Sequence, residues 1–326
     1  MTNTLDCQFG LKKESAYGTP VVVDRFLEFK TVPFKKEKGV VQGEGMRVGS
    51  RTDRADRRTI PFSFITGSLE LDAITKGMGV LWEACMGAGT STLVSAGLYQ
   101  QVFTWADVMP SYTCQVGTWD GTEVNPQTFA GCQVGSWTLN ATEAGIVSLS
   151  VTWIGKSLDD ATALAIASYP VGATSLYTFA HAAFYAGGTL TAPTATTLGS
   201  ATGSALAVVK NFSLSQDNGL KDGPQVGGLS TVRKPTKRAA TGTMEVEYSG
   251  STFLDAINND TSLPLVATFT NGTDVLQLIL PEVRLEGEPP APNGSERITH
   301  PLNFKALEGA AAQAVWVVTR TADAAL

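Results

Sequence analysis

Thr66-Gly67-Ser68-Leu69-Glu70-Leu71-Asp72 is the stretch that decides the fold, because the chain repeats it as Thr241-Gly242-Thr243-Met244-Glu245-Val246-Glu247. Both copies have the alternating apolar pattern of a strand. A short helical phrase follows each copy, at residues 81–85 and at residues 253–257. We therefore expect two copies of one small β domain.

The length of 326 residues also fits about two domains. A segment rich in Ala, Thr, Ser and Gly, residues 157–204, separates the two copies. We place the boundary within it, which gives a first domain at 1–162 and a second at 163–326. The phrase at 177–185 is then expected to be the first strand of the second domain, as 7–14 is of the first.

The fold class that we predict is mainly β, with two tandem β-sandwich or barrel domains, each carrying one short flanking α-helix and a long extended loop. The helices are expected at 76–86 and 251–258, where Met78, Leu81, Trp82 and Cys85 form one apolar face that caps an open side of a sandwich. The turns at Asp120-Gly121, Asn271-Gly272 and Asn293-Gly294 indicate hairpins. The further strands are expected at 25–29, 60–65, 113–116, 133–139, 147–154, 207–214, 243–248, 265–270, 275–280, 298–304 and 314–319.

Composition narrows the class of function. Charged residues make up 17% of the chain and the net charge is −6, so DNA binding is not expected as the main function. Four cysteines without a C-x-x-C spacing indicate reduced thiols. The first residues lack the pattern of a secretion signal, and no apolar stretch reaches the length of a membrane span. We therefore expect neither export nor membrane insertion.

Two segments concentrate positive charge at equivalent places in the two copies. Residues 35–58 hold eight Lys or Arg and four Asp or Glu, and residues 210–238 hold six and two. Long segments without strand signals are uncommon unless they are functional or disordered. We expect each basic arm to reach an acidic surface of a neighbouring copy; two solvated loops, or a phosphate site, are the alternatives. The candidate residues are Lys35, Lys36, Lys38, Arg47, Arg51, Arg54, Arg57, Arg58, Lys221, Arg233, Lys234, Lys237 and Arg238.

Catalytic patterns are missing from the sequence. His181 and His300 have no partner at metal-ligand or catalytic spacing, and the glycine-rich run 43–49 neither follows a parallel strand nor opens a helix. The carboxylates near Glu282 and Glu286 lack the alternation of a calcium loop. We expect no enzyme activity, no metal and no cofactor.

The opening segment 10–20, GLKKESAYGTP, runs into VDRFLEF at 23–29. This opening resembles the start of major tail tube proteins of long, non-contractile-tailed, siphovirus-like bacteriophages. The strand at 67–72 with the helix around 77–87, and the strand at 129–134 leading to 149–156, fit the same pattern. The resemblance covers most of the first half, and it reaches the second half through the repeat.

That resemblance implies a structural virion protein of the phage tail, assembled in the host cytoplasm, whose copies form stacked rings around a lumen that passes DNA without specific binding. It implies tape measure, tail terminator and distal tail proteins as further partners. The two basic arms would bridge successive rings, and an acidic body would let DNA slide. Because the chain carries two sandwich domains, we favour a trimeric, pseudo-hexameric ring. A hexamer in which one domain decorates the outside is the alternative.

The strongest competing function is a receptor- or carbohydrate-binding module of a phage tail. Four tryptophans could build a sugar platform, although two of them lie within alternating strands and are expected in the core. A glycosidase is a more distant possibility. The tryptophans are Trp105, Trp119, Trp137 and Trp153.

Overall fold

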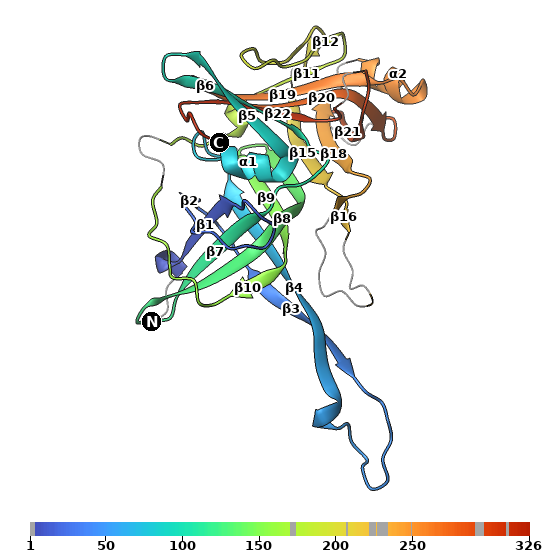
Figure 1. Ribbon diagram of the computed structural model, residues 1–326. Coiled ribbons are helices and arrows are strands. Elements are labelled where there is room, and N and C mark those ends of the chain that lie inside the picture. Colours follow the sequence, from blue (N-terminus) through green and yellow to red (C-terminus); the bar gives the residue numbers. More distant parts are fainter. Residues whose placement is uncertain are drawn as a thin grey trace.

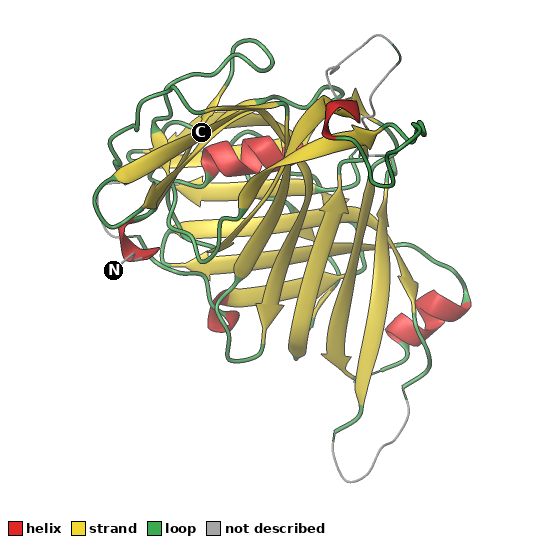
Figure 2. Ribbon diagram, turned by 90° about the horizontal axis from the view of Figure 1, so that it is seen from below, coloured by secondary structure: helices red, strands yellow, loops and turns green. Residues whose placement is uncertain are grey.

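The computed structural model describes residues 4–169, 174–206, 208–221, 226, 234–248, 250–290, 297–310 and 313–326. These residues form hairpins and longer antiparallel pairings, with two short α-helices among them (Figure 2). The predicted mainly-β fold class is therefore confirmed.

The first half of the chain contains one helix, α1 (Gly79–Met86), and two single 3₁₀ turns, η1 (Thr4–Asp6) and η2 (Ala55–Arg57). Its strands are β1 (Gln8–Lys13), β2 (Arg25–Phe26), β3 (Phe34–Gln42), β4 (Arg58–Asp72), β5 (Gly87–Ser95), β6 (Leu98–Trp105), β7 (Tyr112–Trp119), β8 (Val124–Thr142), β9 (Ser148–Gly155) and β10 (Ser157–Asp159).

The second half contains α2 (Thr252–Asn258) and η3 (Phe179–His181). Its strands are β11 (Ala182–Ala186), β12 (Leu190–Thr191), β13 (Ser200–Ala201), β14 (Ser204–Ala205), β15 (Val209–Asp217), β16 (Leu220–Lys221), β17 (Lys234–Pro235), β18 (Ala239–Glu247), β19 (Leu263–Asn271), β20 (Asp274–Glu286), β21 (Thr299–Leu307) and β22 (Trp316–Thr321).

Eight strands drawn from both halves form one continuous antiparallel sheet, in the order β3-β4-β9-β8-β15-β18-β21-β20 (Figure 1). The pairing of β8 with β15 joins the halves. Within each half the pairing scheme is the same, since β1-β7-β8-β9-β4-β3 in the first corresponds to β11-β19-β20-β21-β18-β15 in the second. The hairpin β5–β6 has no counterpart in this scheme and pairs instead with β22.

The apolar side of this sheet forms the core. In β4, Ile65, Leu69 and Leu71 are buried on one side of the strand. Gly67 lies on the same side, and a Cβ there would come within 2.5 Å of the Phe34 ring, so the close approach of β3 requires a residue without a side chain. One apolar cluster runs through both halves of the chain.

Helix α1 lies inside this core rather than on its surface. All eight of its residues are buried, whereas the prediction gave it a single apolar face. Trp82 packs edge-on against Trp137 of β8, with ring centroids 5.5 Å apart. A helix enclosed on all sides needs no polar face. Helix α2, at the equivalent place, buries only Ala256.

Several sequence-based boundaries were wrong. The strand expected at 25–29 is limited to Arg25–Phe26, and the strand expected from residue 177 starts at Ala182 after a 3₁₀ turn. Helix α1 begins three residues later than predicted, because Gly77 has a φ of 80°. The turn expected at Asn293-Gly294 lies outside the described residues.

A buried carboxylate fixes the N-terminal segment to the sheet. Glu14 is 8% exposed, and its two oxygens accept hydrogen bonds from Ser111 Oγ, Thr113 Oγ1, Gly18 N and Gly131 N at 2.7–2.9 Å. Four donors satisfy the charge, so the group stabilises rather than strains the fold.

We expect Glu14→Ala to lower the free energy of unfolding by about 3 kcal/mol, because it leaves buried donors without an acceptor. The measurement is urea unfolding of the unassembled protein. Glu28→Ala, which removes an exposed carboxylate, is the matched control and should change stability by less than about 0.5 kcal/mol. Equal stability of the two variants would contradict this role for Glu14.

Candidate assembly surfaces

The eight-stranded sheet has one face that does not enter the core. Register and burial both place alternate residues of its strands on this polar face. Its members include Lys35 and Glu37 of β3; Thr66, Ser68, Glu70 and Asp72 of β4; Ser148, Ser150, Thr152 and Ile154 of β9; Ser136, Thr138 and Asn140 of β8; Asn211, Ser213, Ser215 and Asp217 of β15; Thr241, Thr243, Glu245 and Glu247 of β18; Thr299, Pro301, Asn303 and Lys305 of β21; and Arg284 and Glu286 of β20.

Hydroxyl, amide and carboxylate groups dominate this polar face. Carboxylates outnumber cations on it, and some are held by neighbours: Asn211 Nδ2 donates to Glu245 Oε2 at 2.9 Å, and Lys30 lies 2.5 Å from Asp72. The sheet therefore offers a broad, hydrated and acidic surface to which both halves contribute.

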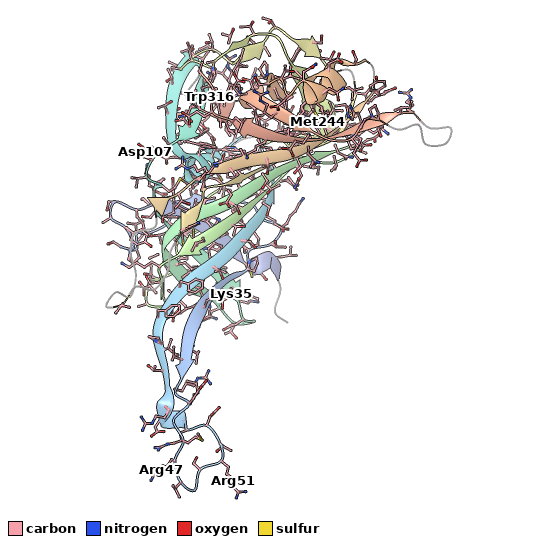
Figure 3. All side chains as sticks on the ribbon, turned by 90° about the vertical axis from the view of Figure 1, so that its right-hand side faces the viewer. Lys35, Arg47, Arg51, Asp107, Met244 and Trp316 are labelled. Carbon is pink, nitrogen blue, oxygen red and sulfur yellow. The ribbon has the colours of Figure 1, made fainter. Side chains whose placement is uncertain are left out.

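The first basic arm is a projecting hairpin rather than a loop throughout. Strands β3 and β4 continue beyond the body, and residues 43–57 connect them at the tip (Figure 1). Arg47 and Arg51 lie at the far end of this tip (Figure 3). Residues 35–58 lack strand signals in the sequence, and this led to the prediction of a loop. Part of the segment nevertheless forms a strand, because a ribbon that is exposed on both faces needs no apolar alternation.

The cations of the first arm differ in how they are held. On β3, Lys35 lies 2.5 Å from Glu37, while Arg54 in the loop pairs with Asp56. The other predicted residues of this arm make no side-chain hydrogen bond or ion pair with the described part of the chain; they are Lys36, Lys38, Arg47, Arg51, Arg57 and Arg58.

Apolar side chains accompany these cations. Met46 and Val48 at the tip are fully exposed, and Val40, Val41 and Ile60 along the hairpin are also exposed. None of residues 43–57 is buried. A protruding hairpin with exposed apolar and cationic groups is typical of a segment that becomes covered by a partner.

The second arm is only partly described. Lys221 ends β16 and is exposed, as is Lys237; Lys234 is described for its backbone alone, and Arg233 lies outside the described residues. Arg238 is bound within its own chain rather than projecting.

Arg238 is held at the junction of the two halves. Its guanidinium lies 5.6 Å from the centre of the Trp105 ring and donates a hydrogen bond to the carbonyl oxygen of Ala106. Burial lowers the pKa of this guanidinium, and the nearby Asp107, labelled in Figure 3, opposes that shift.

The histidines and tryptophans considered as possible catalytic or sugar-binding residues are next. His181 Nδ1 accepts a hydrogen bond from Thr178 N at 3.1 Å, and His300 is buried. Trp137 and Trp153 are buried, which confirms that they belong to the core, and Trp105 lies under Arg238. Within the described ranges, no three His, Cys, Asp or Glu side chains are grouped as a metal ion requires.

Neither helix in the described part of the chain has the length and apolar character needed to cross a bilayer.

Compared with known proteins, the chain matches a family model described as phage tail tube protein over residues 4–306. None of the curated proteins matches it. Because the match extends over nearly the whole chain and agrees with the mainly-β structure, the chain belongs to the phage tail tube protein family.

Proposed function

We propose that this protein polymerises into stacked rings that form the tail tube of a siphovirus-like phage, a conduit for DNA passage into the host. The observation that carries the proposal is the continuous eight-stranded sheet, which has an apolar face toward the core and a polar, acidic face toward solvent. In a soluble monomer one such face would simply be hydrated; in a ring it can line a channel.

The polar face suits the lumen of the tube. Duplex DNA carries a dense row of phosphates, so a cationic lining would bind it and a carboxylate-rich lining repels it. Hydroxyl and amide groups keep the wall hydrated without holding the phosphates strongly. Glu70 of the first half and Glu245 of the second lie on the same face, so both halves would contribute to the wall.

The matching halves support a ring of three chains. We propose units at 1–162 and 163–326, each supplying four strands to the sheet: β3, β4, β9 and β8 from the first, and β15, β18, β21 and β20 from the second. Three chains would present six similar units. The hexamer with one unit outside is less favoured, because both units contribute to the same polar face.

The first arm would reach the neighbouring ring, where its exposed cations and apolar side chains meet an acidic surface. Tape measure, tail terminator and distal tail proteins would meet the tube in the virion. A receptor- or sugar-binding role is less favoured, since Trp137 and Trp153 are buried and Trp105 is covered by Arg238. The proposed role needs no catalysis and no cofactor.

The proposal is tested by concentrating the purified protein and following it by sedimentation velocity and negative-stain electron microscopy. We expect rings and then tubes with a regular axial repeat. A protein that stays monomeric at high concentration, at low and moderate salt, would overturn the proposed function.

A further inference from the structure

The eight-stranded sheet ends in two edges that have no partner strand among the described residues. At one end, β3 pairs with β4 alone. At the other, β20 pairs with β19 only as far as Val283, so Leu285 and Glu286 pair with β21 on one side and are open on the other. An unpaired strand edge is a template for adding another chain.

The chain already contains one such edge-to-edge junction, between β8 and β15. There β15 pairs with the part of β8 that β7 no longer covers, and Ser215 lies opposite Thr138. The two side chains face each other closely enough for Thr138 Oγ1 to donate to Ser215 Oγ at 3.0 Å. This junction shows how the first unit receives the edge strand of the second.

The repeated pairing scheme places β3 and β15 at equivalent positions. Phe34 lies opposite Gly67 in the first unit and Leu214 lies opposite Gly242 in the second, and these glycines are equivalent in the sequence repeat. Lys35 is therefore the counterpart of Ser215.

The same comparison aligns the open part of β20 with β8. Ser136 lies opposite Thr152, and Glu286 lies opposite Asn303, in equivalent strand pairs. Counting two residues onward, Glu288 is the counterpart of Thr138.

We propose that β3 of one copy adds antiparallel to the open edge at residues 286–289 of a second copy, with Lys35 opposite Glu288. This inference rests on the proposed function, because it supplies the contact that would close a ring. Each chain would offer one edge of each kind, so the contact is head-to-tail and can be repeated until the ring closes.

Charge complementarity supports the second copy as the occupant. The β3 edge has exposed Lys35 and Lys36, whereas the β20 edge has exposed Glu286 and Glu288. No ion pair holds either glutamate within the described chain. Opposite charges on facing strands favour pairing, while two β3 edges would repel. In the same register Glu37 lies opposite Glu286, which places two carboxylates face to face. Lys35, whose ammonium lies 2.5 Å from Glu37, is next to this pair and reduces the repulsion between the two carboxylates.

The geometry of both edges limits the contact to a short segment. His300 Nε2 lies 3.1 Å from the carbonyl oxygen of Glu288 and holds the backbone beyond β20. Pro33 precedes β3, and Pro289 and Pro290 follow Glu288. Since proline cannot donate a ladder hydrogen bond, the pairing would stop at these positions.

The test is a pair of cysteines, Lys35→Cys with Glu288→Cys, in a Cys7→Ser background. Directly opposite residues of antiparallel strands have Cα atoms about 4.5–5.5 Å apart, within the range that a disulfide bridges. Mild oxidation of the assembled protein should convert most chains into covalent oligomers on a non-reducing gel. The control, Lys36→Cys with Glu288→Cys, places the thiols on opposite faces and should give almost none.

A charge exchange is the second measurement. Glu288→Lys should impair ring formation at low salt, and adding Lys35→Glu should restore it. The inference is overturned if tubes form normally but the opposite-cysteine variant cross-links no better than its control and the exchange restores nothing. A wild-type protein that forms neither rings nor tubes would instead overturn the proposed function itself.

Discussion

Replacing residues 43–57 with Asn-Gly is expected to stop the growth of tubes while leaving the fold of the chain intact. The tip contains no buried residue, so its removal costs the core nothing. Gln42 and Arg58 are direct partners in the β3–β4 ladder, and Asn-Gly is the preferred two-residue connection between such residues. What is lost is the exposed set of Arg47, Met46 and their neighbours, through which we propose that rings stack.

The measurement is negative-stain microscopy together with thermal unfolding of the shortened protein. We expect an unchanged melting temperature, single rings, and tubes reduced at least about tenfold in length, since we propose that the tip makes the main contacts between stacked rings. Arg54→Gln with Asp56→Asn is the matched control, because it removes an ion pair internal to the arm without changing the arm's net charge. Tubes of wild-type length from the shortened protein would refute the role of the arm.

Reversing charge on the polar face of the sheet should leave assembly intact and impair DNA passage. Glu70→Lys with Glu245→Lys changes one carboxylate in each half on that face. Lysines in a narrow channel would attract phosphates and release their counterions, so the attraction should weaken steeply with salt. We expect virions carrying this variant to release DNA about tenfold more slowly at low salt and close to the normal rate at high salt.

The release rate can be followed by fluorescence of a DNA-binding dye. Asp6→Lys with Glu123→Lys is the matched control, since both residues are exposed and lie beside β7, which is not a strand of the eight-stranded sheet, and the change in net charge is the same. If the two double variants release DNA at the same rate, the polar face does not line the channel.

The strands that the sequence predicted best are rich in apolar residues. Residues 147–154 alternate toward the core and fall almost within β9. Residues 60–65 and 275–280 fall within β4 and β20, and the latter segment is buried on both sides. The hairpin β5–β6 was missed, since its first strand, Gly87–Ser95, is rich in Gly, Ser and Thr and buries only Gly87. Its partner β22 lies more than 200 residues away along the chain, beyond the reach of local patterns.

The candidate surfaces were predictable only in part. The clustering of cations identified the first arm, but composition could not distinguish the exposed Arg47 from Arg238, which is fixed over Trp105 by contacts between distant segments. The polar face had a visible signal in alternations such as Ser148, Ser150 and Thr152. That these alternations align across eight strands depends on the β8–β15 pairing, which no local pattern encodes.

An electron cryomicroscopy reconstruction of the polymerised protein tests the account most directly. We predict a closed wall in which β20 of one chain continues into β3 of the next, with Glu70 and Glu245 facing the channel and residues 43–57 inserted against the adjacent ring. A tube in which the eight-stranded sheets face outward, or in which the edges of β3 and β20 remain unpaired, would contradict it.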